Sequence, residues 1–283
     1  NDAEVEMSRM RPLKAVILAA GSRSITEDGM PVLLQELGGK KIIDYVIENA
    51  AQVASPGDTY VIVGYQQESI TRHLGTGYHY VTQAAPKGTG DALLALRPFL
   101  KSFDGDLLVL YGDTPLFSAT SIRGLINRHR QRKACLTMLT AIAEQPYPYG
   151  RVIRDSTGRI MDIIDAAHAT AWVKEIRELN VGAYMVSASE IWPALEVLMP
   201  SPQDGEYRLT DSIHRLISTG LQVESYQIYD EAEIQGINTR ADLERAEFIL
   251  QKRYFLPRQQ EERNIIRFGT GGWRAIIGEG FTL

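Results

Sequence analysis

Short apolar runs alternate along the first half of the chain with segments whose apolar residues recur at helical spacing. The apolar runs predict strands at 15–19, 60–64, 78–82, 106–111 and 134–142. Helices are predicted between them at 41–51, 66–74, 89–100 and 119–132. Strands and helices that alternate in this way favour a mostly parallel sheet with helices on both faces.

The pattern changes after residue 145. Two short runs, 151–154 and 159–164, flank the turn-like tetrapeptide Asp-Ser-Thr-Gly and predict an inserted β-hairpin. Strands at 180–186 and 221–228, with helices at 210–219 and 240–254, follow the hairpin. We therefore expect an α/β fold with a Rossmann-like, mostly parallel sheet and an inserted β-hairpin region.

The same pattern suggests where the domain begins and ends. Residues 1–10 are interpreted as a flexible N-terminal extension, and residues 11–255 as the main domain. The polar run at 256–264 predicts a linker. Residues 265–283 have the pattern of a strand, a glycine-rich turn and a second strand, which is too short to form a domain alone.

Composition narrows the class of protein. A hydrophobic fraction of 44% and a charged fraction of 23% are ordinary for a globular domain. The net charge of −5 argues against a nucleic-acid partner. No apolar stretch approaches a membrane span, and the first ten residues lack the apolar centre of a signal peptide, so we expect a cytoplasmic enzyme without a membrane partner. Cys135, in an apolar run, is interpreted as a buried strand residue, and Trp172 and Trp192 as packing residues.

Candidate chemistry follows the ends of two predicted strands. The first strand ends in Leu18-Ala19-Ala20-Gly21, whose small residues would let a nucleotide approach the backbone at the carboxyl edge of the sheet. Asp113 comes just after the strand at 106–111. It could hold a divalent cation that bridges phosphates, or it could cap the segment after Pro115.

A loop at 83–89 joins a predicted strand to a predicted helix. The amide of Gln83 could contact the edge of a base, and Gly88 would allow close approach of a ligand. Thr89 would cap the helix that follows. The alternative interpretation is an ordinary capped loop without a ligand.

Together these motifs resemble a known family. LAAG at 18–21, Pro31, QAAPKGT at 83–89 and YGDTPL at 111–116 are similar in order and spacing to the sugar-1-phosphate nucleotidyltransferases, and most of all to the N-acetylglucosamine-1-phosphate uridylyltransferases. Further matches are YGRVIRD at 149–155, ELNVGAYMV at 178–186, EYRLTD at 206–211 and GINTRADLERAE at 236–247. The resemblance covers about residues 13–255 and implies a GT-A-like fold.

The resemblance also implies a reaction and a set of site residues. The substrates would be a sugar-1-phosphate and a nucleoside triphosphate, which this likeness implies is UTP. The products would be a nucleoside diphosphate sugar and pyrophosphate, and the cofactor would be Mg²⁺. Leu18, Ala20, Gly21, Gln83, Gly88 and Thr89 would form the nucleotide pocket. Asp113 and Asn238 would bind Mg²⁺, while Gly150, Asp165 and Asn180 would surround the sugar phosphate.

The sequence departs from the family pattern at three positions. Ile25 and Val32 stand where the phosphate-binding Arg and Lys are expected, and Asp165 replaces the usual Glu. Arg23, which we include with Asp113 and Asn238 among the catalytic candidates, and Lys87 are nearby cations that could substitute. Two hypotheses follow: an active transferase, or a degenerate domain that binds a nucleotide or sugar phosphate and regulates a fused enzyme.

The C-terminal segment IIRFGTGGWRAIIGEGFT at 265–282 resembles the opening of the α-D-phosphohexomutases, the family of phosphoglucomutase and phosphomannomutase. That likeness implies a longer transferase–mutase fusion, of which these residues would be the truncated start of the second domain. The loops a mutase needs would all lie beyond residue 283, so we expect no mutase activity from this chain.

Overall fold

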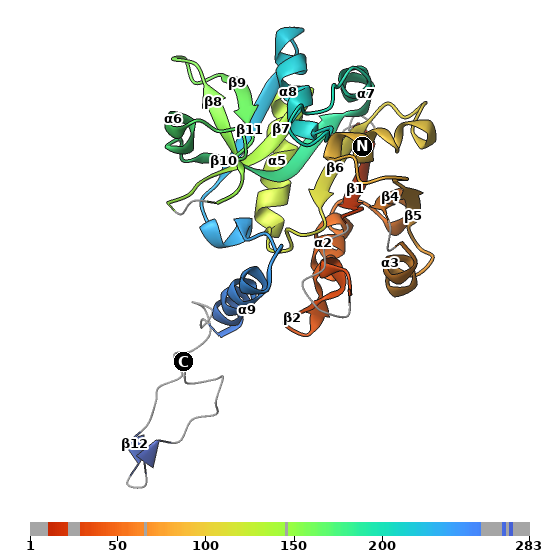
Figure 1. Ribbon diagram of the computed structural model, residues 1–283. Helices are drawn as coiled ribbons and strands as arrows, with labels where there is room; N and C mark the ends of the chain where they lie inside the picture. Colours follow the sequence, from red (N-terminus) through yellow and green to blue (C-terminus); the bar gives the residue numbers. More distant parts are fainter. Residues whose placement is uncertain are drawn as a thin grey trace, which may run out of the picture.

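The computed structural model describes residues 11–21, 29–64, 67–144 and 147–255, together with the strand residues 268–269 and 272–273. Seven strands lie side by side in the order β11-β7-β10-β6-β1-β4-β5 (Figure 1). Their bounds are β1 (Leu13–Ala19), β4 (Thr59–Val63), β5 (His79–Thr82), β6 (Asp106–Tyr111), β7 (Leu136–Ile142), β10 (Glu178–Ser187) and β11 (Val223–Ile228).

The sheet is mostly parallel, as the sequence predicts. Strands β6, β1, β4 and β5 run parallel to one another, and β11 runs parallel to β7. Strand β10 is antiparallel to both of its neighbours, β6 and β7. Its register with β7 shifts between Asn180 and Tyr184, which is typical of a β-bulge.

The predicted hairpin is present as β8 (Gly150–Arg154) and β9 (Ile160–Ile164), which pair antiparallel. Strand β8 also pairs with β10, where Asn180 lies opposite Gly150, and this joins the hairpin to the main sheet. The turn forms because the Asp155 carboxylate accepts hydrogen bonds from the backbone N–H groups of Thr157 and Arg159, at 2.8 and 3.0 Å.

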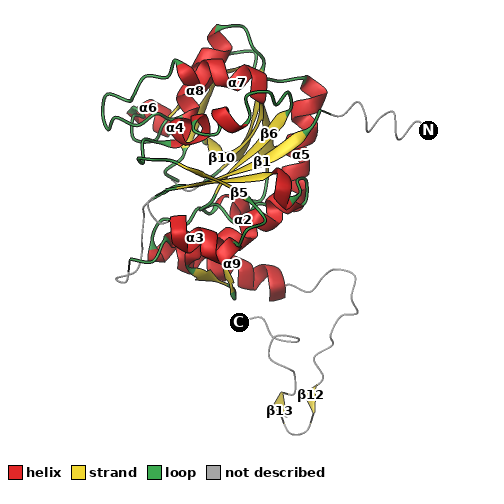
Figure 2. Ribbon diagram, turned by 90° about the vertical axis from the view of Figure 1, so that its right-hand side faces the viewer, coloured by secondary structure: helices red, strands yellow, loops and turns green. Residues whose placement is uncertain are grey.

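Helices cover both faces of the sheet (Figure 2). One face carries α2 (Ile42–Ala51), α3 (Gln67–Leu74), α5 (Ala119–Arg132) and α9 (Arg240–Phe255), and the other carries α4 (Thr89–Leu94), α7 (Ala188–Glu196) and α8 (Leu209–Ser218). Alternate strand residues supply the two cores: Ile17 belongs to the first and Val16 to the second. Each face therefore has its own apolar layer.

The shorter elements complete the described structure. They are β2 (Glu36–Leu37), β3 (Lys40–Lys41), α6 (Ala171–Lys174) and the 3₁₀ helices η1 (Val32–Leu34), η2 (Pro56–Asp58), η3 (Arg97–Phe99) and η4 (Glu231–Ile234). Strands β12 (Phe268–Gly269) and β13 (Gly272–Trp273) pair antiparallel within the segment expected to form a strand, turn and strand. In the ranges given above, no helix has the length and apolar character needed to cross a membrane.

Several local expectations are corrected. The helix expected at 89–100 is divided into α4 and η3, because Pro98 cannot donate a backbone hydrogen bond to a continuing helix. Trp192 is buried at 6% exposure, but Trp172 is 62% exposed and is not a packing residue. Cys135 is buried as predicted but lies just before β7 rather than within a strand, and burial raises the pKa of its thiol to about 12.

Candidate functional site

A cavity of about 280 Å³ opens beside the carboxyl ends of β1 and β6. All six residues predicted for the nucleotide line it, together with both residues predicted for the metal: Leu18, Ala20, Gly21, Gln83, Gly88, Thr89, Asp113 and Asn238. They come from four separate parts of the chain. The fold thus brings the predicted nucleotide and metal residues to one place.

Hydrogen bonds from the buried Gln83 hold the loop after β5 in place. The backbone N–H of Gln83, one residue past the end of β5, donates to the carbonyl of Val63, the last residue of β4, at 2.8 Å. The side chain of Gln83 is only 6% exposed. Its amide nitrogen donates to Asp91 Oδ2 at 2.7 Å and to the Gly88 carbonyl at 3.1 Å. The side chain that borders the cavity therefore has one defined orientation.

Thr89 does not cap its own helix, which corrects the prediction. Helix α4 begins at Thr89 and its N-cap, Gly88, makes no side-chain cap. The Thr89 hydroxyl instead accepts a hydrogen bond at 3.0 Å from the backbone N–H of Leu209, the first residue of α8. It caps a helix that lies far away in the sequence.

Backbone hydrogen bonds attach the same loop to the segment before α8. Tyr207 N–H donates to the Lys87 carbonyl at 2.7 Å, and Gly90 N–H donates to the Tyr207 carbonyl at 2.8 Å. Gly88, between these two bonds, has φ +105°. A Cβ atom placed on it would lie 2.5 Å from the carbonyl oxygen of Tyr207. Only glycine permits this close approach.

Asp113 and Asn238 are brought together by the backbone. Ile237 N–H donates to the Asp113 carbonyl at 2.9 Å, which places Asn238 next to the end of β6. The Asp242 carboxylate accepts from the backbone N–H of Asn238 at 3.1 Å and fixes the start of α9. The alternative role for Asp113 as a helix cap is wrong, because the N-cap of α5 is Ser118.

Tyr149 supports the segment that carries Asn238. Its hydroxyl donates to the Ile234 carbonyl at 2.6 Å, and its oxygen would lie 2.7 Å from a Cβ on Gly236. Burial, followed by the negative charge of Asp113, raises the pKa of the Tyr149 phenol far above its usual range. Tyr149 is therefore a neutral donor that packs beneath the 234–238 segment.

One carboxylate and one side-chain amide fit Mg²⁺ chemically. Magnesium in nucleotide sites is held through one or two protein oxygens, while phosphates and waters complete its octahedron. In the described part of the chain, no three His, Cys, Asp or Glu side chains gather around a common point. Asp113 and Asn238 thus suit a metal shared with substrate phosphates rather than a cage made by the protein.

The sequence of residues 14–231 matches the profile of the nucleotidyl transferase family. The chain is a member of the nucleotidyl transferase family. Among its relatives, bifunctional protein GlmU of Solibacter usitatus is 37% identical over 244 residues, 86% of this chain and 52% of that protein. GlmU of Pelotomaculum thermopropionicum is 37% identical over 241 residues, 85% of this chain and 52% of that protein. The chain spans about half the length of these curated relatives.

Solved structures share the fold of this nucleotidyl transferase. A protein assigned as a glucose-1-phosphate thymidylyltransferase, from Bacillus anthracis, superposes with a TM-score of 0.68 at 19% identity and covers 84% of this chain and 95% of its own. UDP-glucose pyrophosphorylase complexed with UDP-glucose also gives 0.68, at 16% identity, and covers 85% and 98% of the two chains. At these identities the likeness concerns the fold alone.

The three residues predicted for the sugar phosphate meet at the inserted hairpin of the transferase. Gly150 and Asn180 lie opposite each other between β8 and β10, and Asp165 comes directly after the last residue of β9. None of the three lines the cavity. Asn180 is linked to it through two tyrosines: Asn180 donates to the Tyr184 hydroxyl at 2.7 Å, and the Tyr184 ring lies 6.0 Å from that of Tyr111, which lines the cavity.

Some lining residues were assigned no role from the sequence. Tyr111 and Glu206 both border the cavity of the transferase, although each belongs to a motif that carries the family resemblance. Asp91 was not singled out either, although it follows Gln83 by only eight positions and contacts it. The sequence signal for Asp91 was its place in the first turn of the helix that follows the loop with Gln83.

The described lining of the cavity is acidic. It includes the carboxylates of Asp113 and Glu206 and contains neither Arg nor Lys. Val32, where the family has Lys, is 6% exposed and starts η1. Lys87 is exposed and does not line the cavity, while Arg23 and Ile25 lie outside the described residues. The described lining therefore contributes negative side-chain charge and no positive side-chain charge to the cavity.

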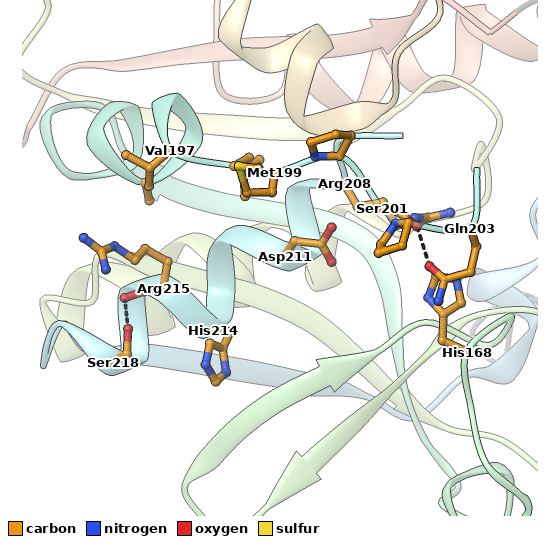
Figure 3. Close-up of a pocket in the computed structure, with 14 residues that line it drawn as sticks. His168, Val197, Met199, Ser201, Gln203, Arg208, Asp211, His214, Arg215 and Ser218 are labelled. Atoms are coloured by element: carbon orange, nitrogen blue, oxygen red, sulfur yellow. Dashed lines mark hydrogen bonds between the residues drawn. The ribbon is translucent and has the colours of Figure 1, made fainter. Parts of the chain in front are cut away.

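A separate groove of about 710 Å³ runs along α8 and the residues after α7 (Figure 3). Its polar lining includes His168, Arg208, Asp211 and His214. No predicted site residue within the described ranges borders it. Arg208 nevertheless links the groove to the sugar region of the transferase, because its Nε lies 3.4 Å from Asp165 Oδ2.

Proposed function

We propose that this chain transfers a nucleotidyl group from a nucleoside triphosphate, UTP, to a sugar-1-phosphate, forming a nucleoside diphosphate sugar and pyrophosphate. One observation carries the proposal. The cavity of about 280 Å³ gathers the strand end at Leu18–Gly21, the loop from Gln83 to Thr89, and the pair Asp113 and Asn238. Family membership and the UDP-glucose bound by a protein of the same fold support the choice of substrates.

The residues would act by position and charge. The methyl group of Ala20 and the absence of a side chain at Gly21 leave room for the nucleotide against the backbone, and the Gly88 backbone would border it from the loop after β5. Gly150, Asp165 and Asn180 would orient the sugar-1-phosphate for in-line attack on the α-phosphorus. A phosphate oxygen forms the new P–O bond, and the bond to the β-phosphate breaks with loss of pyrophosphate. The nucleophile is already anionic, so no general base is required.

Asp113 and Asn238 would hold the Mg²⁺ expected for this reaction. The bound ion would supply charge neutralisation between the anionic nucleophile and the triphosphate. Tyr149 and Asp242 support this function indirectly, because they fix the segments on which Asn238 lies. Arg23 is the proposed further cation at the phosphates.

We also propose that the chain belongs to a longer bifunctional transferase–mutase. The curated relatives are about twice as long as the matched region, and residues 265–282 resemble the start of a phosphohexomutase. A mutase that forms a sugar-1-phosphate would feed the transferase. Mass determination of the protein purified from its native source tests this fusion, and cell fractionation tests the predicted cytoplasmic location.

The second candidate is a regulatory domain that binds a nucleotide or sugar phosphate without efficient turnover. The acidic lining of the cavity and the buried Val32 favour it, because two cations of the family pattern are replaced. Loss of one such contact commonly lowers the rate by about 10²–10³. The two candidates differ in turnover rather than in binding.

Pyrophosphate release decides between them. The purified chain is incubated with Mg²⁺, each of UTP, CTP, GTP, ATP and dTTP, and a panel of hexose-1-phosphates. Asp113→Ala should abolish turnover, whereas Asp58→Ala, which removes a carboxylate paired with Lys14 at 2.7 Å outside the cavity, should not. UTP binding without turnover, followed by a large gain in Ile25→Arg/Val32→Lys, would favour the regulatory domain.

A further inference from the structure

We propose that Asp91 is a positioning residue that sets which bases the cavity accepts, by fixing the orientation of the Gln83 amide. The proposal rests on the proposed function, because it concerns the nucleotide that the transferase would bind. Gln83 borders the cavity and is only 6% exposed. At this burial, the direction in which its amide points has a large effect on any ligand beside it.

Both donor positions of that amide are occupied by the protein. A glutamine side chain offers two N–H donors on Nε2 and one acceptor oxygen, Oε1. Here Nε2 donates to Asp91 Oδ2 at 2.7 Å and to the Gly88 carbonyl at 3.1 Å. Within the described structure, no hydrogen bond reaches Oε1. The acceptor oxygen is thus the part of the amide left for a ligand.

Asp91 makes the opposite orientation unfavourable. An ionised carboxylate accepts hydrogen bonds and cannot donate them, and its bond to an amide N–H is charge-assisted. Rotation of the Gln83 amide by 180° would place Oε1 against the carboxylate and against the Gly88 carbonyl. Asp91 itself lies in the first turn of α4, where the helix dipole favours a negative charge. The carboxylate therefore holds the amide from a rigid element.

A fixed acceptor selects among the bases. Uracil presents a ring N–H between two carbonyl groups on its pairing edge, which complements an acceptor from the protein. Cytosine has an unprotonated ring nitrogen at the same position, so that Oε1 and this nitrogen would face each other without a proton between them. We therefore expect the orientation of Gln83 to favour UTP over CTP, two nucleotides that differ only along this edge.

The test compares UTP and CTP affinities of the full chain in Mg²⁺ by calorimetry. Wild type should prefer UTP, and Asp91→Ala should lower the UTP/CTP affinity ratio by about tenfold, since the amide can then turn. Asp91→Asn keeps an acceptor oxygen without the charge and should give an intermediate ratio. The control Asp58→Asn, away from the cavity, should leave the ratio unchanged.

Side-chain NMR supplies a readout that needs no ligand. The Nε2 protons of Gln83 should exchange slowly in wild type and at least about tenfold faster in Asp91→Ala. Equal Nε2 proton exchange in wild type and Asp91→Ala would overturn this proposal. An unchanged UTP/CTP affinity ratio in folded Asp91 variants, when wild type prefers UTP, would also overturn it. Neither result would refute the proposed function. A wild-type chain that binds neither nucleotide refutes the proposed function, and this proposal with it.

Discussion

Replacement of Gly88 by alanine tests the close contact between the loop at residues 83–89 and the segment before α8. Gly88 has φ +105° and ψ 175°, a region of backbone space occupied almost only by glycine. An added Cβ would lie 2.5 Å from the Tyr207 carbonyl oxygen and 2.9 Å from its nitrogen. Both atoms are fixed by hydrogen bonds to Gly90 and Lys87, so neither can move away without breaking a bond.

The expected loss of stability has two parts. The backbone conformation costs an alanine roughly 1–3 kcal/mol. Forcing a methyl group into a packed contact typically costs about 1–3 kcal/mol more. Gly88→Ala should therefore lower the free energy of unfolding by roughly 2–6 kcal/mol, and affinity for UTP should fall because the loop must shift.

Gly75 provides the matched control. Its φ is +80°, but a Cβ placed on it meets no atom within 4 Å. Gly75→Ala should lose only roughly 1–2 kcal/mol from the left-handed backbone. Urea unfolding of both variants, monitored by circular dichroism, measures the difference between them. Equal losses in the two variants would show that the contact with Tyr207 does not resist the methyl group, and the reasoning would be refuted.

Three further predictions concern charge, pH and support of the site. Chelation of Mg²⁺ should weaken UTP binding by about tenfold or more, because carboxylates line the cavity and repel the triphosphate. Binding of uridine, which has no phosphate, should not change. Equal losses for UTP and uridine in calorimetry would contradict this prediction. Burial alone would raise the pKa of the Asp106 carboxylate, but the imidazole of His129, 3.7 Å away, and the guanidinium groups of Arg11 and Arg130, each 3.5 Å away, lower it below 3.8. The ionised Asp106 carboxylate therefore stabilises the fold above its unfolded pKa, and this contribution is lost as pH falls through the lower folded pKa. Between about pH 5 and pH 3, the urea midpoint of Asp106→Asn should fall less than that of wild type. Tyr149→Phe leaves the Ile234 carbonyl without its donor and should cost about 1–2 kcal/mol in urea unfolding; an unchanged midpoint would count against that role.

Local patterns predicted elements well where the sequence marks both ends. The strand at 106–111 and the helix at 119–132 have the predicted bounds, because a continuous apolar run identifies the first and the Ser118 cap precedes the second. Helix α7 was missed, since Pro193 interrupts its helical pattern. The direction of β10 was also out of reach, because side-chain alternation is the same in parallel and antiparallel strands.

In the candidate site too, features set by neighbouring residues could be predicted, and contacts between residues far apart in the sequence could not. Leu18, Gln83 and Asp113 could be placed at one edge, because Leu18 lies near the end of a predicted strand and the other two each follow one. The carboxyl ends of parallel strands meet there. The partner of Thr89 could not be predicted. Its hydroxyl bonds to a backbone N–H that lies 120 residues away in the chain, and no local pattern encodes that pairing.

That separation has a consequence for synthesis of the protein. Thr89 must wait for Leu209, which at ribosomal rates of roughly 5–20 residues per second is a delay on the order of 10 s. Asp113 likewise waits for Ile237, whose backbone N–H holds Asn238 beside it. A ligand stabilises only the state that binds it, so no ligand of this cavity can stabilise the first half of the chain while it is being made. The early strands must remain soluble on their own packing until the last part of the domain arrives.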